Sequence, residues 1–208
     1  MKGILKQNIF GIEVQEEAVH LTAFSLALAV CDALQPNVIW RELRFEKLVG
    51  ANLQSKDFSD WLSTKPQDTL FSVVVGNPPF MSKVNATARQ YFVRKRRAIS
   101  VPDNQMAYFI LEESIALLAD GGRFCLIQPN GFLFNEKARK FQQSFFQENS
   151  AEFILDFMSI RRLYDGADPK TLALVCTKRP AAAEDKVIHL TFRRTFSVNE
   201  RIAFELDH

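Results

Sequence analysis

Five consecutive residues, Gly76-Asn77-Pro78-Pro79-Phe80, have the groups needed to bind and activate a planar amine. The two prolines fix the backbone and remove two N–H donors, so the carbonyl oxygens of Asn77 and Pro78 remain free as acceptors. The side-chain oxygen of Asn77 adds a third acceptor, and Phe80 adds an aromatic face. Acceptors that bind both N–H groups of a conjugated amine localise its lone pair on nitrogen. The motif therefore predicts methyl transfer to an amino group, and a Pro-Pro turn with a core Phe is the alternative.

The segment before this motif is expected to place it at the end of a strand. Residues 70–75 (LFSVVV) are a continuous apolar and β-branched run, typical of a strand buried on both faces of a parallel sheet. The run stops at Gly76 and the two prolines. Because open α/β sheets bind ligands beyond the carboxyl ends of their strands, this position favours a functional site.

Strands and helices are expected to alternate along the rest of the chain. Strands are expected at residues 9–14, 123–128, 153–157, 171–177 and 187–192, with another inside 38–49 that ends at Gly50-Ala51-Asn52. Helices are expected after residue 15 (with Ala18, Leu21, Phe24, Leu28 and Cys31 at helical spacing), at 104–119 after a capping Asp103, and at 136–148; residues 53–69 form a helix or a linker. This alternation predicts an α/β fold with a mainly parallel sheet and helices on both faces.

Composition narrows the class of protein. The 208 residues, 47% apolar and 24% charged, suffice for one globular domain. No apolar run reaches the roughly 18 residues that span a bilayer, so we expect a cytoplasmic protein without a membrane partner. The cysteines and histidines show no ligand spacing, so neither a metal site nor a disulfide framework is expected. A net charge of +2 is too small to identify a nucleic-acid partner.

Three segments, in order, resemble the amino-methyltransferases that act on N6 of adenine in DNA. Residues 9–29 resemble their second conserved segment, residues 76–80 their catalytic motif, and residues 106–133 the helix and strand after the catalytic loop. The spacing is similar to the methylase core of type II and IIG restriction-modification enzymes. The resemblance covers about residues 8–178 and leaves 179–208 as a C-terminal extension. It implies a Rossmann-like class I methyltransferase fold, S-adenosyl-L-methionine as cofactor and DNA as partner.

The resemblance implies roles for the residues around the base. Asn77, Pro78, Pro79 and Phe80 would bind and activate an adenine flipped out of the duplex, and Asn77 would also lie near the cofactor. Tyr164 matches a second aromatic residue that packs against the flipped base. An ordinary half-buried loop tyrosine is the alternative at that position.

The resemblance also implies two acidic contacts with the cofactor. Glu13, at the end of the first expected strand, would accept hydrogen bonds from the ribose hydroxyls, although an ordinary helix-start carboxylate is the alternative. The next contact lies near the cofactor's adenine, where the family has an acid. Here that position falls on Asn52, which we expect to end a strand, and Asp57, followed by Phe58, is the other candidate.

Basic residues follow the motif and are candidates for contact with DNA phosphates. They are Lys83, Arg89, Arg94, Lys95, Arg96 and Arg97, with Tyr91 and Phe92 among them. Because they lie beside the motif, they suit a lid over bound DNA. A solvated charged surface is the alternative reading of such a run.

Part of the family pattern is missing before residue 9. The family's first strand and its glycine-rich turn, which wraps the methionine moiety, should lie there, but the eight preceding residues contain no Gly-x-Gly. That strand is central in the family's sheet, so we expect exposed strand edges. The chain would then be a fragment, would be completed by a missing N-terminal segment or partner subunit, or would be inactive. A separate target-recognition domain would have to read the DNA sequence.

Two other functions fit the same residues. Related enzymes methylate a glutamine side-chain amide in proteins with an Asn-Pro-Pro-aromatic motif, although their aromatic residue is usually Tyr. The long basic stretch between Phe80 and Asp103 favours DNA over that substrate. A non-catalytic methyltransferase-like module that binds DNA or a partner is the third hypothesis, and the missing glycine-rich turn is its main support.

Overall fold

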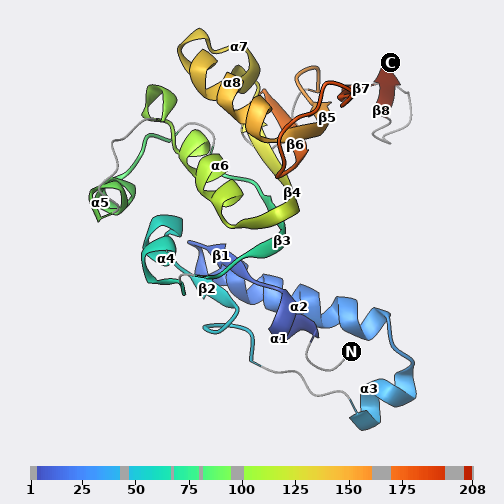
Figure 1. Ribbon diagram of the computed structural model, residues 1–208. Helices are drawn as coiled ribbons and strands as arrows, with labels where there is room; N and C mark the ends of the chain where they lie inside the picture. Colours follow the sequence, from blue (N-terminus) through green and yellow to red (C-terminus); the bar gives the residue numbers. More distant parts are fainter. Residues whose placement is uncertain are drawn as a thin grey trace. The chain divides into compact units, whose positions relative to one another are not determined.

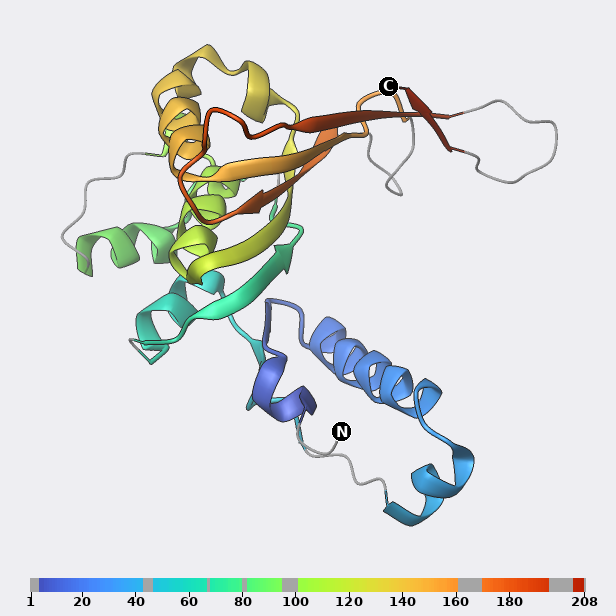
Figure 2. The same ribbon diagram turned by 45° about the vertical axis from the view of Figure 1, so that its right-hand side comes forward.

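The structure, a computed structural model, describes residues 4–42, 47–66, 68–79, 82–94, 101–160, 170–194 and 204–207. The chain divides into two compact units. Unit 1 comprises Met1–Lys65 and Val93–Lys95, and unit 2 comprises Pro66–Phe92 and Arg96–His208. Figures 1 and 2 show their elements from two directions.

Unit 1 contains a parallel pair of short strands. Strand β1 (Gly11–Glu13) pairs with β2 (Leu53–Ser55), and Glu13 lies opposite Ser55. A Cβ at Gly11 would lie 2.9 Å from Leu53 Cδ2, so the close approach of the two strands favours glycine there. The helices of the unit are α1 (Ile4–Asn8), α2 (Glu16–Asp32), α3 (Pro36–Glu42) and α4 (Phe58–Thr64).

Helix α2 confirms the helix expected after residue 15, but it does not pack through the stripe seen in the sequence. Leu21, Phe24 and Leu28 are 65%, 60% and 52% exposed. A core cluster of unit 1 instead consists of Val19, Leu48 and Leu53, with Leu5, Ala23, Leu26 and Val49 packed against it. Helical periodicity identified the helix but not the face that is buried.

The main sheet of unit 2 has, among the described residues, the strand order β3-β4-β6-β5-β7-β8. Its strands are β3 (Phe71–Gly76), β4 (Leu118–Pro129), β5 (Ser150–Asp156), β6 (Thr171–Thr177), β7 (Ile188–Arg194) and β8 (Phe204–Asp207). The β3–β4 and β5–β7 pairs are parallel, whereas β6 runs antiparallel to both β4 and β5, and β8 runs antiparallel to β7. The sheet is therefore mixed, and the expectation of a mainly parallel sheet was wrong. An apolar run locates a strand but does not give its direction.

Helices α6 (Met106–Ala116) and α8 (Arg139–Glu148) lie on the same side of this sheet, as Figures 1 and 2 show. On β4, Phe124, Leu126 and Gln128 alternate with more exposed residues and are at most 1% exposed. The Phe124 ring contacts Phe145 of α8, with centroids 6.0 Å apart, so this is the covered face. The shorter helices are α5 (Ala86–Arg94), α7 (Gly131–Phe134), η1 (Pro102–Asn104) and η2 (Glu136–Ala138).

The sequence suggests that strand β3 is buried on both faces, but one of its faces is exposed. Val73 and Val75 are 61% and 72% exposed, and they lie opposite Arg123 and Cys125 rather than on the covered face. Within the described residues β3 pairs only with β4, and β1 pairs only with β2. The expected exposed strand edges are thus present in both units.

Two local expectations were also wrong. Within residues 38–49, where a strand was expected, residues 38–42 belong to α3, which begins with Pro36, a residue favoured in the first turn of a helix, and residues 43–46 lie outside the described residues. Helix α6 begins at Met106, and Asp103 does not cap it; the N-cap is Gln105, which makes no side-chain cap hydrogen bond. Asp103 instead has a left-handed backbone, with φ of 50°.

The described residues contain no group of three or more His, Cys, Asp or Glu side chains placed to hold a metal ion. Their cysteines are free, and Cys176 is buried whereas Cys31 and Cys125 are half-buried. Burial raises the pKa of the Cys176 thiol to about 12, so it stays protonated at neutral pH. None of the helices in the described part of the chain is long and apolar enough to cross a membrane.

Candidate active site

The Asn77-Pro78-Pro79 corner directly follows β3. The ladder between β3 and β4 ends at the pair Gly76 and Leu126, because Pro78 and Pro79 have no N–H to continue it. Asn77 and Pro79 are exposed, whereas Pro78 is buried and anchors the corner. The corner therefore presents the Asn77 side chain at the carboxyl end of a strand, as expected. Phe80 lies outside the described residues.

Strand β4 ends beside the same end of the sheet and contains a buried amide that we had not singled out. Gln128 is 0% exposed, and neither its Oε1 nor its Nε2 has a hydrogen-bond partner in the structure. A buried amide without partners is unfavourable by about 1–3 kcal/mol for each unsatisfied group. Its only sequence signal is one amide residue within the apolar run 123–129.

In unit 1, Glu13 ends β1 and is exposed. Its Oε1 accepts a hydrogen bond from Gln15 N at 2.9 Å, and its backbone oxygen accepts one from Lys56 N at 3.0 Å. Ser55 Oγ donates to Val14 O at 3.0 Å, which ties the ends of β1 and β2 together. Glu13 is therefore held at the carboxyl end of the parallel pair, the position expected for a contact with ribose.

The structure separates the two candidates for the second cofactor contact. Asn52 precedes β2 instead of ending a strand, so the reason for choosing it was wrong. Its side chain is 5% exposed, and its Nδ2 donates to Lys6 O at 2.6 Å and to Ile9 O at 2.9 Å. Asp57 follows β2 at the carboxyl end, and its Oδ1 accepts from Ser59 N at 2.8 Å as the N-cap of α4. Asp57 thus has the position that we had assigned to Asn52.

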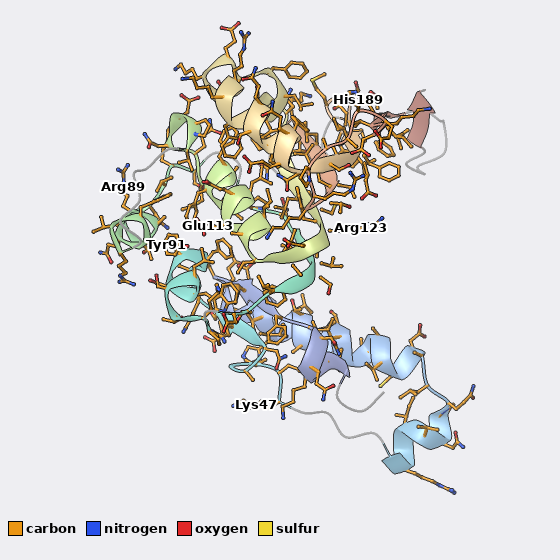
Figure 3. The ribbon with its side chains drawn as sticks, in the orientation of Figure 1. Lys47, Arg89, Tyr91, Glu113, Arg123 and His189 are labelled. Carbon is orange, nitrogen blue, oxygen red and sulfur yellow. The ribbon has the colours of Figure 1, made fainter. Side chains whose placement is uncertain are left out.

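The basic stretch after the corner contains helix α5, where the sequence had shown little periodicity. Asn85 Oδ1 caps the helix by accepting from Ala88 N at 2.8 Å. Tyr91 is buried, and its hydroxyl donates to Glu113 Oε2 of α6 at 2.7 Å. Arg89 is exposed, and Figure 3 shows where these labelled side chains lie on the two helices. The buried side of α5 therefore fixes the helix and leaves Arg89 facing solvent.

The remaining basic candidates differ in their surroundings. Arg94, at the end of α5, is exposed. Lys83 is exposed as well, but its Nζ donates to the backbone oxygen of Asp103 at 2.8 Å. Other predicted contacts lie outside the described residues, namely Lys95, Arg96, Arg97 and the aromatic Tyr164.

Asp103 forms a cluster near the corner that the sequence did not reveal. Its Oδ2 accepts from Asn135 Nδ2 at 2.9 Å, and its Oδ1 lies 3.5 Å from Lys137 Nζ. The hydrogen bond from Asn135, together with the charges of Lys137 and Lys83, outweighs desolvation and lowers the pKa of Asp103. Asn135 Nδ2 also donates to the hydroxyl of Tyr108 at 3.4 Å, and burial raises the pKa of Tyr108. Asp103 is therefore a carboxylate at neutral pH.

Comparison with solved structures identifies the class of fold. The M protein of the type I restriction enzyme EcoKI aligns with a TM-score of 0.57 at 17% identity, over 89% of this chain and 35% of that protein. The type IIG restriction endonuclease BpuSI gives a TM-score of 0.46 at 26% identity, over 66% of this chain and 16% of that one. A nuclease-deletion mutant of the type ISP enzyme LlaGI, in complex with a DNA substrate mimic, gives 0.44 at 10% identity, over 90% and 26%. The EcoKI alignment shows an α/β fold like that of a methyltransferase subunit.

This chain spans about a third of the length of the EcoKI M protein. No curated protein matches the sequence. A family model does match it, over residues 7–163, which is about three quarters of the chain and includes the β1 segment, the corner after β3 and the helix–strand pair α6–β4. The chain belongs to the Eco57I restriction-modification methylase family.

Proposed function

We propose that this chain carries the catalytic part of a DNA methyltransferase that transfers a methyl group from S-adenosyl-L-methionine to N6 of adenine. The observation that carries the proposal is the Asn77-Pro78-Pro79 corner at the carboxyl end of β3, with Asn77 exposed and Pro78 buried, in a member of a restriction-modification methylase family. Such a corner offers acceptors and few donors, which suits an amine and not a carbonyl group.

In this proposal the corner acts on the amine directly. Asn77 Oδ1 and the carbonyl oxygen of Pro78 accept hydrogen bonds from the two N–H groups of adenine N6. These bonds concentrate the lone pair on nitrogen, and Phe80 packs against the flipped base. The proton displaced from the nitrogen passes to solvent. S-adenosyl-L-methionine, when bound, supplies the electrophilic methyl group.

The donor set of unit 1 fits a nucleoside cofactor. Glu13 and Asp57 follow two adjacent parallel strands, where ligands bind in α/β folds. We assign Glu13 to the ribose hydroxyls and Asp57 to the adenine ring. For the methionine end, we propose a strand and glycine-rich turn supplied by polypeptide outside the described residues. The single-sided pairing of β3 and its exposed Val73 and Val75 support this part of the proposal.

DNA is the proposed polymer because basic side chains follow the corner. Arg89 and Arg94 are exposed on α5, and α5 is held by the buried Tyr91–Glu113 hydrogen bond. A rigid helix that carries exposed arginines suits contact with phosphates. Methylation of a glutamine amide requires no such helix.

Calorimetric titration of this chain with S-adenosyl-L-methionine tests cofactor binding. We expect binding that Glu13→Ala weakens, while Glu17→Ala, which removes another exposed acid in the first turn of α2, leaves it unchanged. Methyl transfer from labelled cofactor to unmethylated DNA of mixed sequence then tests the activity, with N6-methyladenine identified by mass spectrometry of the nucleosides. If the chain bound the cofactor but methylated protein glutamine and not DNA, the proposed substrate would be wrong. Failure to bind the cofactor would favour a non-catalytic DNA-binding or partner-binding module.

A further inference from the structure

The segment that follows the corner is fixed by hydrogen bonds to a turn about 20 residues later in the chain. Val84 N donates to Asn104 O at 2.7 Å, and Met106 N donates to Ser82 O at 2.8 Å. Lys83 and Gln105 form an antiparallel bridge between these two segments. Whatever holds the turn in place therefore also holds residues 82–84, which follow the catalytic corner in sequence.

The turn has an unfavourable backbone. Asp103 and Asn104 are both left-handed, with φ of 50° and 52°. Asp and Asn tolerate this region better than other residues with a Cβ, but usually as single residues, and two in succession need stabilising contacts. Within the turn, Asn104 N donates to Val101 O at 3.2 Å and Gln105 N donates to Pro102 O at 3.1 Å, and contacts from outside the turn add to these.

The Asp103 side chain supplies such contacts. Its carboxylate accepts from Asn135 Nδ2 at 2.9 Å and lies 3.5 Å from Lys137 Nζ, in the segment that follows β4. Its backbone oxygen accepts from Lys83 Nζ at 2.8 Å, in the segment that follows β3. Asn135 is in turn oriented by the hydroxyl of Tyr108, which is 1% exposed. One residue thus connects the loops that follow the two parallel strands β3 and β4.

We infer that Asp103 is a positioning residue for the catalytic corner. It holds residues 82–85 against the loop after β4, so that this part of the chain is already in place when the base arrives. The inference rests on the proposed function for its effect on catalysis. It rests on the structure alone for its effect on residues 82–85.

The experiment compares four chains: unaltered, Asp103→Ala, Asp103→Asn and Asp185→Ala. Asp185 provides the matched control, because it too is a hydrogen-bonded carboxylate with a lowered pKa, but it pairs with Arg179 after β6. Hydrogen–deuterium exchange is measured for peptides that cover residues 82–94 and 101–108. Initial rates of methyl transfer are measured against DNA concentration and against S-adenosyl-L-methionine concentration.

Asp103→Ala is expected to speed exchange at residues 82–85 about tenfold or more, because a hydrogen bond to a charged group is lost. It is also expected to lower kcat by a similar factor, with less than about a twofold change in KM for the cofactor. Asp103→Asn should recover part of both effects, because Asn adopts the left-handed conformation readily and still offers an acceptor to Asn135. Asp185→Ala should change neither quantity.

Two results would overturn the inference: unchanged exchange at residues 82–85 in Asp103→Ala, or equal loss of kcat in Asp103→Ala and Asp185→Ala. If the unaltered chain transferred no methyl group to DNA, the proposed function would fail. The exchange comparison would then still decide whether Asp103 holds the segment after the corner.

Discussion

In unit 2, the charged side chains at the amino ends of the strands make different contacts from those at the carboxyl ends. At the amino end of β4 and β5, Asp185 forms hydrogen bonds with Arg179, Ser150 and Ala182 N, all between 2.8 and 2.9 Å. The contacts of Asp185 with Arg179 and Ala182 span only six and three residues in sequence, whereas the contact with Ser150 spans 35. At the carboxyl end, the contact between Asp103 and Asn135 joins residues that are 32 apart.

This difference separates stabilising groups from functional ones. The amino-end carboxylate closes a local turn and uses most of its acceptors within it. The carboxyl-end groups instead fix loops against one another, and Asn77 at this end is exposed. The same contrast occurs in unit 1, where Asn52 is buried before β2 and Asp57 lies after it. Groups after the strands should therefore affect function, whereas groups before the strands should affect stability.

The largest expected effect is at Asn77. Asn77→Ala should lower kcat for methyl transfer by about 100-fold or more, because one positioned hydrogen-bonding group for the reacting amine is lost. Its thermal unfolding should be unchanged, since the side chain is exposed. Rates with labelled cofactor and mixed-sequence DNA provide the measurement. Asn37→Ala, at an exposed asparagine of α3, is the control, and a similar loss of rate in both variants would contradict the assignment.

A smaller effect is expected at the end of β2. Asp57→Ser keeps an N-cap for α4 but removes the carboxylate, so cofactor affinity should fall about tenfold with little loss of stability. Asn52→Ala should instead lower the stability and leave the cofactor affinity almost unchanged. It removes hydrogen bonds to two backbone carbonyls and should cost about 1–3 kcal/mol of stability. Calorimetry and urea unfolding measure the two quantities, and a loss of cofactor affinity confined to Asn52→Ala would restore our first assignment.

DNA affinity should depend on the exposed arginines of α5 and not on Arg123 of β4. Arg89→Ala and Arg94→Ala should each weaken binding by a factor of about three to ten and reduce the salt dependence by about one counterion. Arg123→Ala removes another exposed arginine, which pairs with Glu152 at 3.3 Å, and should leave binding unchanged. Fluorescence anisotropy with labelled duplex at several salt concentrations distinguishes them. Equal losses in all three variants would indicate a non-specific effect of net charge.

The smallest expected effect is the pH dependence of stability at the amino end. Hydrogen bonds from Arg179, Ala182 N and Ser150 hold the pKa of Asp185 well below its ordinary value of 3.8. A lowered folded-state pKa gives stabilisation that is complete above the ordinary value and is lost as the pH falls through the folded value. The Tm should therefore decline below about pH 4, and less steeply in Asp185→Asn. The Tm of the unaltered chain and of Asp185→Asn is measured between pH 2 and 7, about the range in which carboxyls titrate. Parallel curves would show that Asp185 contributes nothing to the pH dependence of stability.

Local patterns in the sequence located most of the strands. Residues 171–177 form β6 as expected, and β3 lies within one residue of the expected 70–75, because continuous β-branched runs have few other conformations. The same reasoning placed a strand inside residues 38–49, of which residues 38–42 form the end of helix α3 instead. It also placed Asn52 at the wrong end of its strand. Boundaries depend on which turn the chain adopts, and residues 50–52 fit a turn before a strand as well as after one.

By itself, the sequence determined the corner. Two adjacent prolines after a β-branched run restrict φ and remove donors through covalent structure, so Asn77-Pro78-Pro79 needs no distant contact to become an acceptor-rich turn. Only the tertiary structure decided what holds it. The Asp103–Asn135 and Tyr91–Glu113 hydrogen bonds join residues 32 and 22 apart, and neither partner carries a local signal for the other. Such pairs form only once the register of β3 and β4 and the packing of α5 and α6 are fixed, because these place the side chains within hydrogen-bond distance.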